Sequence, residues 1–158
     1  MSAQLVVIEL NDQLYGVDAR SIHEIIKQIR ITRVPNSKPY VEGIANLRGK
    51  IIPVIDTRKL LALTDSKDSD KSSIIFVNLK VNDQHKTLGF RFDRVWQVIN
   101  YNPEELEKIP NYGSDVNTES IVGILEDSRF PKPVIVIELE KVINYFDQRS
   151  ILQENAQQ

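Results

Sequence analysis

The two halves of this 158-residue chain carry the same short apolar runs in the same order. The run 5–10 corresponds to 74–79, and an Asn-Asp-Gln turn sequence follows each run, at 11–13 and at 82–84. The later matches join Tyr15-Gly16-Val17 to Leu88-Gly89-Phe90, Val34-Pro35-Asn36 to Ile109-Pro110-Asn111, 41–44 to 121–124, and 52–61 to 134–143. Matches in one constant order predict an internal duplication, which constrains the fold more than any single motif does.

The matched runs predict an all-β fold built of small barrels. They are rich in β-branched residues, have the length of strands and are separated by Gly and Pro. Each half holds about 60–70 residues and is small for an independent core, so we expect the halves to pack together or to exchange strands. Binding sites favour such junctions, and the groove between the halves is therefore the first place where we expect a function.

A polar segment separates the halves. From Thr64 to Ser73 the chain contains only Thr, Asp, Ser and Lys, which are too polar to form a core. We therefore expect a single domain over 1–152, with a first subdomain near 5–61, an exposed connection at 62–73 and a second subdomain near 74–145. The polar residues 153–158 are expected to form a disordered tail.

One helical signal interrupts the strands. Four isoleucines between positions 22 and 29 follow the i, i+3, i+4, i+7 spacing of one helix face, and Asp18 precedes them as a candidate N-cap. This pattern predicts a short helix or turn near 19–26, while 29–34 could equally form a strand. A further turn is expected near 103–107.

The composition argues against several classes of function. The chain has no Cys, and its two His leave little for metal binding or acid–base catalysis. It contains no P-loop and no Gly-x-Ser-x-Gly elbow. The net charge of −2 gives no basic footprint for nucleic acid, and no apolar stretch reaches the ~18 residues of a membrane span. The N-terminus lacks the basic region of a signal peptide. We expect a cytoplasmic, non-enzymatic protein without cofactors.

The segment 46–50 is the most informative local motif. Asn46-Leu47-Arg48-Gly49-Lys50 separates two apolar runs, and Gly49 permits a tight or left-handed turn. Asn46 can bond the backbone of this turn, which would place the guanidinium of Arg48 at its tip. Spacing alone leaves open a plain hairpin turn with a solvated arginine.

Together with this motif, a longer pattern resembles the CheW-like chemotaxis coupling family, from about residue 5 to residue 145. The pattern consists of Tyr15-Gly16-Val17-Asp18, Ile22-x-Glu24-Ile25, Thr32-x-Val34-Pro35, and Val41-x-Gly43-Ile44-x-Asn46-Leu47-Arg48-Gly49-x-Ile51-Ile52-Pro53-Val54-Ile55-Asp56-x-Arg58. The second half matches less closely, because Gln97 stands where Glu is common. Ala45 and Glu138 are milder departures.

The resemblance implies two packed, five-stranded β-barrels and a stand-alone adaptor without catalysis. Such proteins bind the regulatory domain of the chemotaxis histidine kinase and the cytoplasmic tip of methyl-accepting chemoreceptors. They are thereby recruited to receptor arrays at the membrane without inserting into it. The residues that we carry over to partner binding are Ile22, Glu24, Val34, Gly43, Ile44, Arg48 and Gly49. For Glu24 and Arg48 the alternative is one local ion pair.

Two other classes of function were weighed. A small barrel that binds single-stranded nucleic acid would need a basic face bearing aromatic residues, whereas the aromatic residues here mostly occupy core positions of strands. An enzyme would need a tight cluster of perturbed titratable groups in a pocket. The sequence favours the adaptor over both alternatives.

Overall fold

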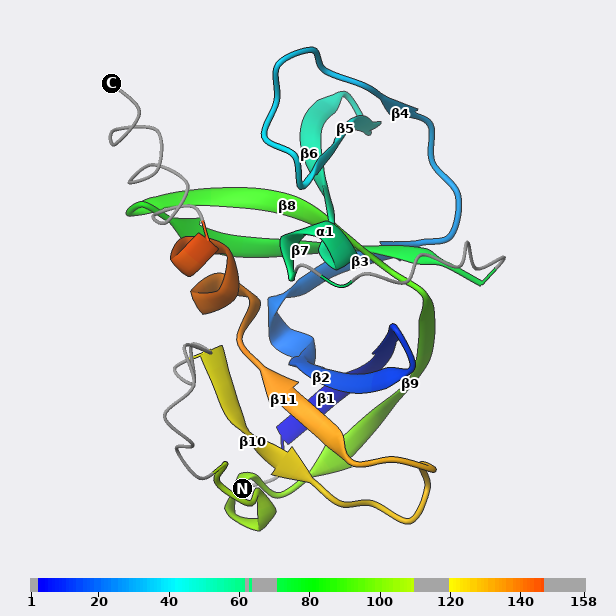
Figure 1. Ribbon diagram of the computed structural model, residues 1–158, viewed down its shortest axis with the longest axis vertical. Helices are drawn as coiled ribbons and strands as arrows, with labels where there is room; N and C mark the ends of the chain where they lie inside the picture. Colours follow the sequence, from blue (N-terminus) through cyan, green and yellow to red (C-terminus); the bar gives the residue numbers. More distant parts are fainter. Residues whose placement is uncertain (1–2, 62, 64–70, 110–119, 147–158) are drawn as a thin grey trace.

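The computed structural model describes residues 3–61, 63, 71–109 and 120–146, and its strands form two sheets (Figure 1). Sheet one contains, in spatial order, β10 (Ile121–Leu125), β11 (Val134–Ile137), β2 (Gln13–Asp18), β1 (Ala3–Leu10) and β9 (Arg94–Tyr101). Sheet two contains β3 (Ile22–Ile26), β7 (Ser73–Val81), β8 (Gln84–Phe92), β6 (Lys50–Asp56), β5 (Val41–Leu47) and β4 (Ile31–Thr32). The helical segments are η1 (Ala19–Ser21), α1 (Thr57–Leu60), η2 (Pro103–Glu105) and residues 139–146.

The two sheets do not follow the two halves of the sequence. The hairpin β1–β2 of the first half pairs with β9 and β11 of the second half. In return, the hairpin β7–β8 of the second half pairs with β3 and β6 of the first half. The two halves therefore exchange hairpins, which was one of the two arrangements that the sequence left open. The ranges 5–61 and 74–145 describe the sequence repeat and do not correspond to the two sheets.

The strand register reproduces the repeat that the sequence predicted. Each sheet has one parallel pairing, in which Val54 faces Gly89 in sheet two and Val136 faces Gly16 in sheet one. The Gly16 and Gly89 correspondence of the sequence thus recurs in the pairing. The hairpin turns correspond too, because Asn11 and Asp12 have φ values of 52° and 64°, and Asn82 and Asp83 have 51° and 62°. These are the left-handed conformations of a two-residue hairpin turn. Pro110 lies outside the described residues.

The prediction of a helix near 19–26 was mostly wrong. Asp18 does cap a helical turn, since its side chain accepts a hydrogen bond from the Arg20 backbone N–H, but that turn ends at Ser21. Residues 22–26 form β3 and pair with β7. The isoleucine spacing fits a helix face, but β-branched residues also favour strands, and pairing with a neighbouring strand decided between the two. The turn predicted near 103–107 is present as η2.

Two details differ from the expected fold, and one element is additional to it. Sheet two has six strands rather than five, because the two-residue β4 adds to its edge, and sheet one has only an isolated bridge between Glu107 and Ile124 at that place. The expected exposed connection 62–73 lies partly outside the described residues, and its last residue, Ser73, is buried at the start of β7. The helix at 139–146 was not predicted.

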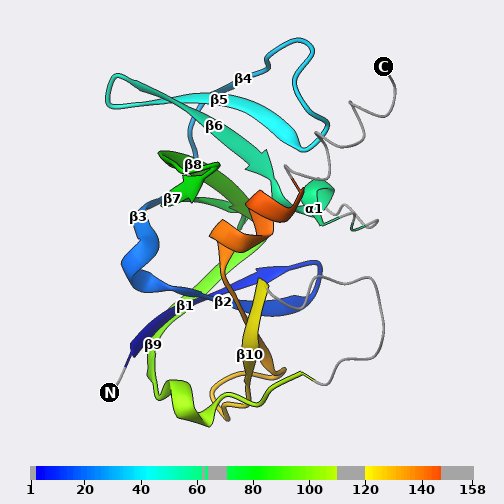
Figure 2. The ribbon, with the colours of Figure 1, turned by 90° about the vertical axis from the view of Figure 1, so that its left-hand side faces the viewer.

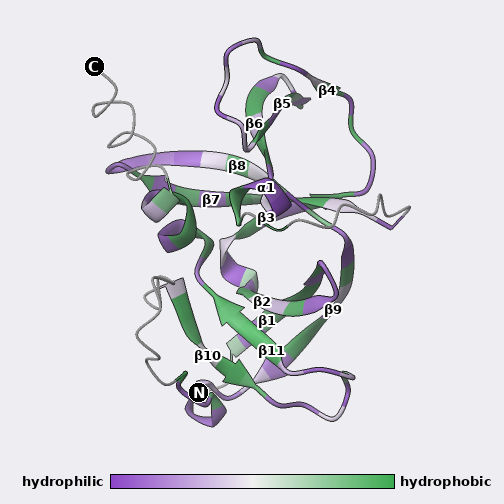
Figure 3. Ribbon diagram, viewed as in Figure 1, coloured by the Kyte–Doolittle hydropathy of each residue, from purple (hydrophilic) through white to green (hydrophobic). Residues whose placement is uncertain are grey.

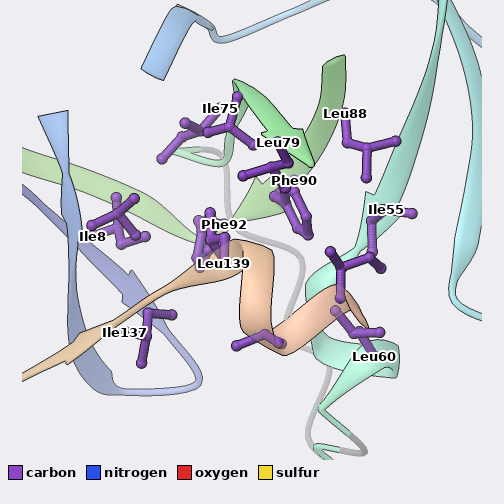
Figure 4. Close-up of a cluster of buried hydrophobic side chains, with 14 of the residues drawn as sticks. Ile8, Ile55, Leu60, Ile75, Leu79, Leu88, Phe90, Phe92, Ile137 and Leu139 are labelled. Atoms are coloured by element: carbon purple, nitrogen blue, oxygen red, sulfur yellow. The ribbon is translucent and has the colours of Figure 1, made fainter. Parts of the chain in front are cut away.

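The junction between the sheets is filled by the largest apolar cluster of the described chain (Figure 4). The hydropathy colouring of the ribbon shows that β10 and β11 of sheet one are mostly hydrophobic (Figure 3). Ile8 comes from sheet one and Phe90 from sheet two, and Leu139 joins them from the helix 139–146. This helix lies between the two sheets in both views of the ribbon (Figures 1 and 2). Two smaller clusters fill the interiors of the sheets, one around Val7 and Val134 and one around Val54 and Phe76. Where the sequence predicted a groove between the halves, this cluster forms a packed core.

Candidate partner-binding surface

The β5–β6 hairpin ends in the tight turn that the sequence predicted. Leu47 pairs with Lys50, so Arg48 and Gly49 form the two-residue turn, with φ values of 52° and 86°. The Gly49 backbone N–H donates a 2.8 Å hydrogen bond to Oδ1 of Asn46. The amide side chain therefore holds the turn, and the Arg48 side chain projects from its tip with 75% of its surface exposed.

Arg48 and Glu24 form an ion pair, which was the alternative that the sequence left open for them. Nη2 of Arg48 lies 2.8 Å from Oε1 of Glu24, whose side chain is only 18% exposed. The contact joins β3, at one edge of sheet two, to the hairpin near its other edge. The guanidinium stays mostly in water and leaves donors available for a partner, whereas the Glu24 carboxylate is largely buried.

The other predicted site residues fall into two groups. Gly43 is buried on β5, where a Cβ atom would lie 2.3 Å from the backbone oxygen of Thr32, so this glycine allows β4 to approach. Ile44 beside it is half-buried, and Val34, in the loop between β4 and β5, is 36% exposed. Ile22 lies apart from them on β3 and packs against the junction core. Ile44 lies on the strand that leads into the Arg48 turn, and Val34 follows the β4 strand that pairs with it. Ile22, in contrast, lies at the sheet junction.

Sequence reasoning missed a basic surface around the Arg48 turn. Between Glu24 and Glu42 the chain has four basic residues and no acidic one. The pairing of β4 with β5 brings this segment beside the hairpin. We call this surface the basic end and define it as Lys27, Arg30, Arg33, Arg48 and Lys50, all of them exposed. Apart from Arg48, these side chains make no ion pair among the described residues. Ile51, which is 60% exposed, adds apolar surface beside them.

The corresponding place in the second half is acidic. The bridge between Glu107 and Ile124 corresponds to the pairing of Thr32 with Ile44 in the repeat. We define the acidic end as Glu104, Glu105, Glu107 and Glu126; beside them Asp127 is paired with Arg129, and Lys108 follows Glu107. Bonds from the Arg129 side chain lower the pKa of Asp127 to about 2. The elements that carry the two ends lie at opposite extremes of the long axis (Figure 1).

The described residues contain no candidate metal site. No group of three or more His, Asp and Glu among them could hold a metal ion. Within the same residues, no helix is long and apolar enough to cross a membrane. The notable features of this part of the chain are therefore its two charged ends and the exposed apolar residues beside them.

Comparison with known proteins identifies the family. The sequence profile of the CheW-like domain matches residues 4–146. The chain belongs to the CheW-like family. It is 32% identical over 143 residues to the chemotaxis protein CheW of Treponema pallidum, a match that covers 89% of this chain and 82% of that protein. It is 27% identical over 155 residues to CheW of Bacillus subtilis, covering 98% and 90%.

A solved structure agrees with this assignment. The crystal structure of the scaffolding protein TtCheW from Thermoanaerobacter tengcongensis matches with a TM-score of 0.76 and 34% identity. The match covers 90% of this chain and 92% of that one. The predicted family and the mostly-β, two-sheet fold are thereby confirmed, and the chain is a chemotaxis scaffold of the CheW-like type.

Proposed function

We propose that this protein couples the cytoplasmic tip of a transmembrane chemoreceptor to the regulatory domain of the chemotaxis histidine kinase. The observation that carries the proposal is Arg48, an exposed arginine on a turn held by Asn46, within a family of chemotaxis scaffolds. Arginine is enriched among the residues that dominate binding energy at interfaces. A side chain on a fixed turn also loses less conformational freedom on binding than one on a loose loop.

The receptor contact is assigned to the edge of sheet two. A receptor tip is a helical hairpin, and a helix docks onto apolar residues flanked by a few polar anchors. The seven site residues include the apolar side chains Ile22, Val34 and Ile44 and the polar pair Glu24 and Arg48. Gly43 and Gly49 act indirectly, by allowing the close approach of β4 and the tight turn.

The kinase contact is assigned to the loops at the acidic end, which leaves the basic end with Arg48 for the receptor. The regulatory domain of the kinase is itself a CheW-like module, so it offers ends of the same shape. The two ends of this chain differ in charge from each other, which would favour a different partner at each of them. Binding to these partners would recruit the protein to receptor arrays at the membrane without insertion of its own chain.

Titration calorimetry with Arg48→Ala tests the proposal. The full chain is titrated with a receptor signalling fragment and, separately, with the kinase regulatory domain. We expect Arg48→Ala to weaken binding of at least one partner by more than about 1 kcal/mol, which marks an interface residue that matters. Its melting temperature should change little, because the Arg48 side chain is mostly exposed.

The matched control is Arg20→Ala. Arg20 is also exposed and also paired, with Asp18, at 2.8 Å. Arg20 lies on η1, outside the basic end. The Arg20→Ala protein should therefore bind both partners as the unmodified protein does. Normal binding of both partners by a folded Arg48→Ala protein would contradict the assignment of Arg48.

A further inference from the structure

The chain crosses between the two sheets at two short connections. The first is η1, which leads from β2 to β3. The second is a single residue, Asp93, between the end of β8 in sheet two and the start of β9 in sheet one. In Figure 1 the ribbon runs almost without a break from β8 into β9. Asp93 is therefore at the point where the relative position of the sheets is set.

Asp93 forms a charged clasp between the sheets. Its backbone N–H donates to the Glu9 carbonyl of β1, and its Oδ2 accepts a 2.8 Å hydrogen bond from the backbone N–H of Asn11, at the tip of the β1–β2 hairpin. Its Oδ1 lies 2.7 Å from Nη2 of Arg58, on the helix α1 that follows β6 of sheet two. The two side chains are only 15% and 16% exposed. One carboxylate thus bonds both sheets.

A second, neutral clasp occupies the corresponding place in the other half. Asn144 lies on the helix 139–146, which follows β11 of sheet one. Its Nδ2 donates to the Lys80 carbonyl at 2.9 Å, and its Oδ1 accepts from the Asn82 backbone N–H at 3.2 Å. Glu140 adds a bond from the Lys80 N–H to its Oε2. In both halves, the helix after the last strand of that half is linked to the hairpin tip of the other sheet, directly by Asn144 and through Asp93 in the case of Arg58.

The two clasps differ in kind from the junction core. Burial of apolar surface is non-directional, so the core holds the sheets together without selecting one angle between them. Hydrogen bonds and ion pairs depend strongly on distance and angle. Contacts of this kind at the two hairpin tips would therefore select one orientation out of several that the core permits.

We propose that Arg58, Asp93 and Asn144 are positioning residues, which fix the orientation of the two sheets and thereby of the surfaces that each sheet presents to partners. None of the three belongs to the surface assigned to partner binding above. The inference goes beyond the proposed function, because it concerns the free protein and stands or falls without any partner.

Distance measurements between spin labels test it. The chain has no cysteine, so a pair of introduced cysteines carries all the label. Ile51→Cys in sheet two and Val122→Cys in sheet one report across the sheets, because these side chains are 60% and 43% exposed. Ile25→Cys with Ile51→Cys reports within sheet two. Pulsed electron paramagnetic resonance then gives each distance distribution, in the unmodified background and with Arg58→Met and Asn144→Ala combined.

We expect the distribution across the sheets to broaden or shift in the combined variant, while the distribution within sheet two stays unchanged. Arg20→Met is the matched control, since it removes an arginine from the other crossover whose ion pair with Asp18 is local; it should change neither. An unchanged distribution across the sheets, or equal broadening of both label pairs, would overturn the proposal. If the combined variant does not fold, Asn144→Ala alone is judged by the same criteria.

Discussion

The first and second halves of the chain have the same strand register but opposite surface charge. Val54 faces Gly89 and Val136 faces Gly16, so the parallel pairings coincide in the repeat. The β3–β5 connection and the β5–β6 turn nevertheless carry the basic end, while the glutamates at 104–107, after β9, and Glu126, after β10, form the acidic end. The backbone pairing was retained where side chains pack, and the charges diverged where side chains are exposed.

The difference separates what the fold requires from what recognition can use. Pairing and packing constrain the buried positions, since core substitutions that change volume are costly. Exposed positions on the connections carry no such constraint and can take either sign of charge. A duplicated module with unlike ends can bind two different partners, which is the property that a coupling adaptor needs.

The largest difference between the halves should appear at the two clasps. Asp93→Ala leaves the Arg58 guanidinium, which is 15% exposed, without this carboxylate and should lower the free energy of unfolding by about 4 kcal/mol. Asn144→Ala removes neutral hydrogen bonds at an exposed site and should cost about 1 kcal/mol. Urea denaturation of both variants measures the two values. Equal losses would show that charge and burial do not distinguish the clasps.

Gly43 and Gly123 lie at register shifts of β5 and β10. Substitution of the first-half glycine should again cost more stability than substitution of the second-half glycine, but the difference should be smaller than at the clasps. A Cβ atom on Gly43 would lie 2.3 Å from the Thr32 oxygen, whereas one on Gly123 would lie 2.9 Å from the Glu107 oxygen. Overpacking of this kind costs about 1–3 kcal/mol, so we expect about 3 kcal/mol for Gly43→Ala and about 1 kcal/mol for Gly123→Ala. Thermal unfolding compares them. A larger loss at Gly123 would mean that β4 yields more readily than the segment around Glu107.

Charge reversal at the ends should have the smallest effect on stability and a clear effect on association. Arg30→Glu with Arg33→Glu reverses part of the basic end, and Glu104→Lys with Glu105→Lys reverses part of the acidic end. We expect each double variant to slow association with one partner by about tenfold at low salt, because charges at an interface act mainly on the association rate. Stopped-flow measurements at several salt concentrations provide the test. Identical behaviour of both variants toward both partners would remove the functional difference between the ends.

Much of the fold could be predicted because the turns depend on adjacent residues and the repeat can be recognised by comparing the two halves of the sequence. The Asn-Asp turns and the Asn46–Gly49 turn each rest on residues close in sequence. The exchange of hairpins was only one of two alternatives, because pairing between β2 and β11 depends on contacts 120 residues apart, between Leu14 and Val134. The helix at 139–146 was missed because the matched runs 52–61 and 134–143 were each interpreted as one strand, whereas each is a strand followed by a helix.

The candidate site was predicted less completely. The Arg48 turn was identified from the sequence, and its ion pair with Glu24 was one of the two alternatives considered for these residues. The basic end was overlooked because the net charge of the whole chain is only −2, although the run of cations without an acidic residue at 25–41 was visible. The difference in charge between the two ends becomes apparent only when the charged residues at corresponding positions of the two halves are compared.

The most direct test of the account is whether one chain binds both partners at once. The full-length protein is mixed with a receptor signalling fragment and the kinase regulatory domain, singly and together, and the mass of each complex is measured by analytical ultracentrifugation. The account predicts a ternary complex that contains all three components, heavier than either binary complex. Displacement of one partner by the other, with no ternary species at saturating concentrations, would contradict it.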